Sequence, residues 1–148
     1  NSALSEGIYE GYDMPNVRSG ANTLHPFSEG ITAYNSGDYS KAIPFFQGIV
    51  VDDPRYAEAQ FYLGHALLNS KDFAGAATQF KKVQTLNDVR YTENAEWYQV
   101  VAQLSEDNTN EEFTILLSKI VNDQNHTFNS QATALQNKLN SFWRKLVF

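Results

Sequence analysis

The feature that most constrains this chain is a stretch of sequence that occurs twice. Residues 37–46 reappear as residues 71–80, at an offset of ~34 residues. The same register extends beyond the stretch, because Gly30 corresponds to Gly64. A unit that recurs at this period predicts a stacked array in which each unit packs on its neighbours.

The first unit, residues 26–54, has the pattern of two helices joined by a turn. Its apolar residues recur at the spacing of one helix face, and Gly37 suits the turn that follows. The second helix is expected over residues 39–51, with Val50 facing inward. Pro44 lies early in this helix, where backbone donors still lack partners, so it can be tolerated there.

The second unit, residues 55–88, is the most regular. Its helices are expected over residues 55–69 and 73–86, and Asp72 is a predicted N-cap. The apolar positions of both helices follow those of the first unit. The two units are therefore expected to pack in the same way.

The third unit, residues 91–124, diverges from the other two. Its spacing is stretched by about three residues, and its helices are expected over residues 93–106 and 111–122. Phe113 takes the place of Ala42 and Ala76. The larger residue predicts a helix pair that is wider than the others, or shifted.

The two ends of the chain lie outside the repeats. Residues 1–25 contain helix-breaking glycines but too many apolar residues for a solvated tail. They are expected to form an irregular extension that packs on the repeats, to lie in the groove as a built-in ligand, or to be an unfolded linker. Residues 127–148 predict the capping helix that a stacked array needs. Trp143 and Phe148 look exposed, which indicates a lost continuation or an oligomer contact.

Composition excludes several classes of function. The chain has 148 residues, a net charge of −6 and no cysteine. Its Lys and Arg residues are scattered and form no basic patch in the sequence, which argues against binding to nucleic acid or to an anionic membrane surface. Disulfides and thiol chemistry are excluded, and no apolar run approaches the ~20 residues of a membrane span. The chain begins at Asn1 without Met, so it is expected to be a processed or trimmed piece of a longer protein.

The repeated motifs resemble the signatures of the tetratricopeptide repeat (TPR) family. Residues 37–43 read GDYSKAI, residues 61–66 read FYLGHA, and Asp53-Pro54 ends the first unit. The resemblance covers about residues 26–126. It implies an all-α, right-handed TPR superhelix of about three helix-turn-helix units plus a C-terminal capping helix. Asp88, where the family has proline, and Phe113, where it has alanine, depart from the pattern.

A narrower resemblance involves three short stretches, residues 12–18, 95–98 and 122–126. They look like a bacterial group in which a TPR ectodomain follows a single membrane helix, preceded by a short cytoplasmic domain similar to anti-sigma modules. The resemblance implies a periplasmic scaffold, tethered to the membrane in the full-length protein.

No constellation of residues predicts catalysis. His25, His65 and His126 lie in three different elements, without the spacing of a metal site. His65 is expected to be a polar contact in the groove, and His126 a cap or a solvent-facing residue. The adjacent pairs 52–53 and 111–112 are expected to cap helix ends. The chain is therefore predicted not to be an enzyme and to hold no metal or cofactor.

The first helix of each unit lines the concave surface of a TPR array, and the register predicts which residues face this groove. The predicted set combines aromatic rings, amides and acids without Lys or Arg, which favours a basic or apolar-aromatic peptide over a C-terminal carboxylate. Alternatively, Phe61 and Tyr98 pack between helices. The predicted groove residues are Phe27, Ile31, Tyr34 and Asn35 from the first unit, Glu58, Phe61, His65, Leu68 and Asn69 from the second, and Tyr98, Ala102 and Glu106 from the third.

The sequence thus predicts a protein–protein interaction scaffold that binds a peptide or protein segment in its concave groove. The alternative is a structural module that assembles with itself, its groove filled by residues 1–25. Self-association would use the C-terminal helix. The identity of the partner is not encoded in any motif.

Overall fold

The computed structural model of the chain describes residues 25–107 and 109–147. These residues form helices and no strand, which confirms the all-α prediction. The predicted extension, except His25, and Phe148 lie outside the described residues. The helices are α2 (Pro26–Asn35), α3 (Tyr39–Gln47), α4 (Tyr56–Asn69), α5 (Phe73–Thr85), α6 (Thr92–Ser105), α7 (Glu111–Asn122) and α8 (Asn129–Val147).

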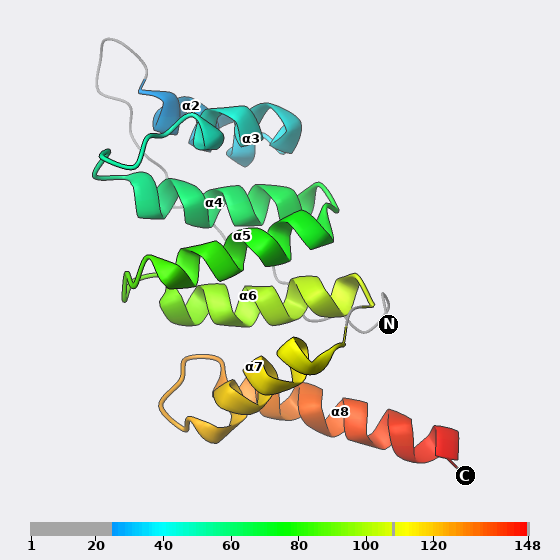
Figure 1. Cartoon of the computed structure of the whole chain (residues 1–148). Coiled ribbons are helices and arrows are strands. Elements are labelled where there is room, and N and C mark those ends of the chain that lie inside the picture. Colours follow the sequence, from blue (N-terminus) through cyan, green and yellow to red (C-terminus); the bar gives the residue numbers. More distant parts are fainter. Residues whose placement is uncertain (1–24, 108, 148) are drawn as a thin grey trace.

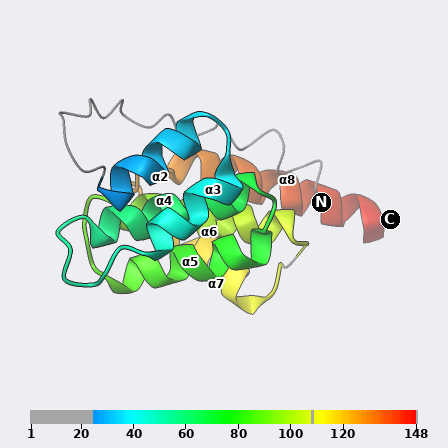
Figure 2. The same ribbon diagram turned by 90° about the horizontal axis from the view of Figure 1, so that it is seen from above.

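The helices are stacked in chain order. Figure 1 shows α2 to α6 one above the next, with α7 inclined to α6 and α8 at the far end of the stack. Viewed from above, α5 and α7 lie along one edge of the stack, and α2 and α8 lie along the other (Figure 2). The second helices of the last two units therefore share one side of the molecule.

Side-chain caps fix where the second helix of each unit begins. Asp38 accepts a hydrogen bond from the backbone N–H of Lys41 at 3.1 Å, and Asp72 accepts one from Gly75 at 2.9 Å. Asn110 does the same for Phe113 at 3.0 Å. Each cap satisfies a backbone donor that the first helical turn leaves without a partner. The prediction for Asp72 is thus confirmed.

The turn inside each unit uses one residue with positive φ. Gly37 has a φ of 79°, and Lys71 and Asp107 hold the corresponding places with φ of 66° and 58°. Only the first unit meets this requirement with glycine, the residue for which the conformation has no steric cost.

The prediction that the second helix of the first unit extends to residue 51 is wrong. α3 ends at Gln47, and Gly48 is its C-cap. Val50 was expected to face inward, but it is 67% exposed in the connection that follows. Pro44 is accommodated inside α3, as expected.

In each of the first two units, an aromatic ring of the second helix packs closely against the backbone of the first helix. Phe46 and Phe80 are fully buried, and each ring lies against a glycine of the preceding helix, Gly30 and Gly64 respectively. Counted from the helix start, α6 has Val100 where α4 has Gly64. A side chain at this place prevents the same close approach, which accounts for the inclined α7 in Figure 1.

Within residues 25–107 and 109–147, no helix is both long enough and apolar enough to cross a membrane.

Candidate functional site

The predicted groove residues include a row of side chains that crosses three helices. Asn69 donates from Nδ2 to the Tyr34 hydroxyl at 2.9 Å and to the His65 carbonyl at 2.8 Å. The His65 ring then meets the Tyr98 ring edge-on, with 4.4 Å between centroids. These four residues, Tyr34, Asn69, His65 and Tyr98, are called the first-helix row. They connect α2, α4 and α6.

Most of the twelve predicted groove residues are buried, because they also hold the first helices against their neighbours. The Phe61 ring, for example, lies 5.0 Å from the Tyr91 ring and 6.2 Å from the Phe80 ring. Asn35 and Glu106 are exposed, and Glu58 and Asn69 are half-buried. The buried members are Phe27, Ile31, Tyr34, Phe61, His65, Leu68, Tyr98 and Ala102.

Burial sets the charge of this surface. It lowers the pKa of His65 to about 3, so the imidazole is neutral at pH 7. Burial also raises the pKa of Glu58, against the lowering effect of Arg55 and Arg90. Two of the predicted groove residues therefore have titration behaviour that differs from that of free side chains.

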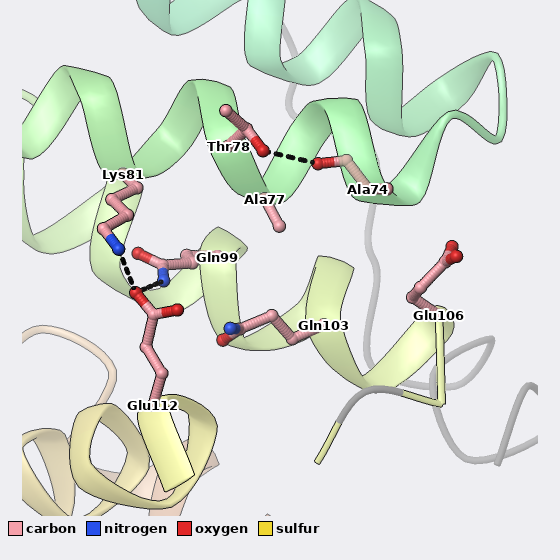
Figure 3. Close-up of a pocket in the computed structure, with 8 residues that line it drawn as sticks. All are labelled: Ala74, Ala77, Thr78, Lys81, Gln99, Gln103, Glu106 and Glu112. Atoms are coloured by element: carbon pink, nitrogen blue, oxygen red, sulfur yellow. Dashed lines mark hydrogen bonds and ion pairs between the residues drawn. The ribbon is translucent and has the colours of Figure 1, made fainter. Parts of the chain in front are cut away.

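The structure contains a cleft that sequence analysis did not identify. It has a volume of about 310 Å³ and lies between α5 and α7, with α6 as its floor (Figure 3). We call it the α5–α7 cleft. Its lining residues follow helical spacing on α5 and on α6, which is the only sequence signal for it. They are Ala74, Ala77, Thr78 and Lys81 from α5, Gln99 and Gln103 from α6, Glu106 at the C-terminal end of α6, and Glu112 from α7.

Polar contacts connect the walls of this cleft. Glu112 Oε1 accepts from Lys81 Nζ at 2.7 Å and from Gln99 Nε2 at 3.4 Å, as the dashed lines of Figure 3 mark. Glu106, which the register assigns to the concave groove, lines this cleft. Gln103 is 4% exposed, and its Oε1 has no hydrogen-bond partner among the described residues.

A buried carboxylate holds the third unit and α8 together. Glu96 on α6 is 4% exposed and is paired with Lys119 of α7 and with His126, whose Nε2 lies 3.1 Å away. His126 Nδ1 also accepts from the Phe128 backbone N–H at 3.0 Å. His126 is 5% exposed, so the solvent-facing alternative is wrong, and its bond to Phe128 lies in the turn before α8 begins at Asn129.

The third histidine, His25, is paired with an acidic residue in another part of the chain. His25 Nε2 lies 3.0 Å from Asp53, far in sequence from the other two histidines. Asp53 also accepts the Arg55 backbone N–H at 2.8 Å, just before α4 begins. Within the described ranges, no three His, Cys, Asp or Glu residues are grouped as a metal ion requires.

Comparison with known proteins agrees with the helix-turn-helix architecture. Residues 27–88, which span α2 to α5, match the family model described as tetratricopeptide repeat. Neither the comparison with curated proteins nor that with solved structures gave a match. Tetratricopeptide repeats generally mediate protein–protein interactions and form a non-catalytic scaffold. The first two helix pairs of this chain are therefore similar to tetratricopeptide repeats.

Proposed function

We propose that this chain is a protein-interaction domain that receives a segment of a partner protein along the first-helix row. The continuity of the row across α2, α4 and α6 carries the proposal. Tyr34, Asn69, His65 and Tyr98 are linked by a hydrogen bond at 2.9 Å and a ring contact at 4.4 Å. Tyr34, His65 and Tyr98 are themselves buried, so a partner would lie over the row and contact the accessible residues of the predicted groove, Asn35, Glu58 and Asn69. An extended or helical segment can bind along a groove in this way.

The chemistry of the surface favours a basic or apolar-aromatic segment. None of the predicted groove residues is Lys or Arg, and the nearby cations Arg55 and Arg90 already act on the Glu58 carboxylate. Asn35 and Glu58 supply an amide and an acid beside the aromatic rings. The net charge of −6 attracts basic partners at long range.

An affinity purification followed by a binding measurement tests the proposal. The intact chain is used to capture proteins from an envelope extract, and peptides covering a captured protein are then titrated by fluorescence anisotropy. Tyr34→Phe with Asn69→Leu removes the linking hydrogen bond and leaves the ring in place. We expect this variant to bind at least tenfold more weakly.

A substitution far from the row provides the control. Gln131 is exposed on α8, so Gln131→Ala should bind like the unmodified chain. If the row variant binds with unchanged affinity while its helix content is preserved, the first-helix row is not the binding surface.

We further propose a periplasmic location, with the full-length protein tethered to the membrane. The support is the resemblance carried by residues 12–18, 95–98 and 122–126. Protease treatment of whole cells and of spheroplasts tests this. Cleavage only after the outer membrane is opened is expected, and protection in spheroplasts would contradict it.

The exposed end of α8 favours a second candidate function, self-assembly. Phe142, Trp143 and Leu146 are 45%, 58% and 62% exposed, and a second copy of the chain could cover them. Sedimentation velocity tests this directly. A dimer that dissociates in Trp143→Ser supports it, and a monomer at high micromolar concentration excludes it.

A further inference from the structure

We propose that the α5–α7 cleft is a second binding site, which takes an arginine side chain from a protein partner. This goes beyond the first-helix row, because the cleft is built from α5, α7 and the α6 residues between them. The two walls differ in chemistry. Ala74, Ala77 and Thr78 present small side chains, while the opposite wall presents amides and carboxylates (Figure 3).

The buried amide of Gln103 is the observation that points to a ligand. Its Oε1 is withdrawn from solvent, and no donor within residues 25–107 and 109–147 reaches it. A buried acceptor without a partner is destabilising, because it has lost its hydrogen bonds to water without replacing them. A guest that brings an N–H group to this oxygen therefore gains affinity from a site that is already desolvated.

A second cleft in the same protein provides a comparison. The cleft between the end of α3 and α5 is lined by Gln60, Gln79 and Lys82, among others. There, Gln79 Nε2 and Lys82 Nζ both donate to Gln60 Oε1 at 2.9 Å. The acceptor in that cleft is already used.

The charges around Gln103 select a cation. Glu106 is exposed and has no ion pair with any described residue, and Glu112 is shared with a single cation, Lys81. Two carboxylates against one ammonium leave the cleft with one excess negative charge. A guest that combines positive charge with several N–H donors fits this arrangement.

Arginine has the geometry that the cleft requires. Its planar guanidinium carries five N–H donors, so it can reach the Gln103 oxygen and a carboxylate at the same time. Its aliphatic stem can lie along Ala74 and Ala77. The volume of about 310 Å³ is about ten times the ~30 Å³ that a water molecule occupies in the liquid, which is room for a side chain.

The first test uses N-acetyl-Gly-Arg-Gly-amide as the probe, titrated into the isotopically labelled chain and followed by NMR. We expect chemical-shift changes at the Gln103 side-chain amide and at the backbone of Ala77 and Thr78. The matched peptide with citrulline keeps the shape but lacks the charge, and it should bind about tenfold more weakly. Equal binding of the two peptides would overturn the assignment of a cation.

Substitutions in the cleft measure separately how much the Gln103 acceptor and the Glu106 charge contribute to binding of the peptide. Gln103→Met removes the buried acceptor at similar volume, and Glu106→Gln removes the unpaired charge; each should weaken binding about tenfold. Gln60→Met in the other cleft is the matched control and should leave binding unchanged. Unchanged binding in both Gln103→Met and Glu106→Gln would overturn the proposal, as would the absence of shifts in the cleft.

A third arm separates a protein side chain from free arginine. The carboxylate of free L-arginine would be repelled by Glu106 and Glu112, whereas the capped peptide has none. We expect the capped peptide to bind more tightly. Tighter binding of free L-arginine would show a small-molecule site and would overturn the proposal of a protein partner.

Discussion

The ring of Phe80 packs directly against the α-carbon of Gly64. A Cβ atom at residue 64 would lie 2.7 Å from Cε1 of this ring, and one at Gly30 would lie 2.6 Å from the same atom of Phe46. Both distances are shorter than a carbon–carbon contact allows. The repeated glycine is thus the condition for close packing between the two helices of each of the first two units.

Replacing Gly64 by alanine should therefore destabilise the protein, although alanine is the better helix former. Phe80 is fully buried, so its ring has little space to move. We expect a loss of about 1–3 kcal/mol in the free energy of unfolding, from overpacking. Urea denaturation followed by circular dichroism measures it. Gly48→Ala is the control, since its nearest contact would be an ordinary 3.4 Å.

The positive-φ residues of the turns predict opposite effects on stability for Lys71→Gly and Gly37→Ala. Lys71 has a φ of 66°, a conformation that costs a non-glycine residue about 1 kcal/mol or more. Lys71→Gly should therefore leave stability unchanged or raise it by up to about 1 kcal/mol, whereas Gly37→Ala should lower it by about 1 kcal/mol. Both can be read from the midpoint of urea unfolding. A clear loss in Lys71→Gly would contradict this account of the turn.

Removing the buried carboxylate of Glu96 should be among the most damaging single changes in the third unit. Glu96→Ala leaves the buried Nε2 of His126 without its partner, and a buried polar atom left unsatisfied costs about 1–3 kcal/mol. Lys119→Ala is the comparison. The Lys119 side chain is 62% exposed and can be replaced by water, and Glu96 keeps His126 as a partner, so the loss of Lys119 should cost less than the loss of Glu96. Thermal unfolding of the two variants should differ by many degrees.

Acid should weaken the fold through His65. Its pKa is about 3 in the folded state, below the ordinary value of 6.5, because burial disfavours the charged form. Below pH 6.5 the unfolded chain thus binds a proton that the folded chain does not. The free energy of unfolding therefore falls with decreasing pH, by about 1.4 kcal/mol per pH unit at most.

The variant His65→Gln isolates this contribution. It should be less stable at pH 7, because the aromatic packing of the imidazole is lost. Its stability should change less than that of the unmodified chain between pH 6.5 and 5. Parallel curves for the two proteins over this range would show that another group is responsible.

The architecture could be predicted because it depends on local sequence. The 34-residue offset between residues 37–46 and 71–80, and the caps at Asp38 and Asp72, are properties of short stretches. The residues at which helices end were harder to predict. α3 ends at Gln47, with Gly48 as its C-cap, even though the apolar residues continue to Val51.

The candidate sites could be predicted only in part. The register brought Tyr34, His65, Asn69 and Tyr98 to one group of helices, and the structure joins them in a row. The position of a residue in the repeat did not predict how deeply it is buried, because an aromatic side chain at such a position can either pack between helices or lie on the surface. Phe61, for example, is fully buried between rings of other helices.

By itself the sequence determined an array of helix pairs, since the period, the caps and the close-packing glycines all act between residues near in the chain. The tertiary structure alone decided the α5–α7 cleft and the buried partners of Glu96. The cleft depends on how far the inclined α7 stands from α5, and the Glu96 pairs depend on which helix faces meet. Both depend on contacts between α6 and its neighbouring helices, where Val100 of α6 holds the place that Gly64 has in α4.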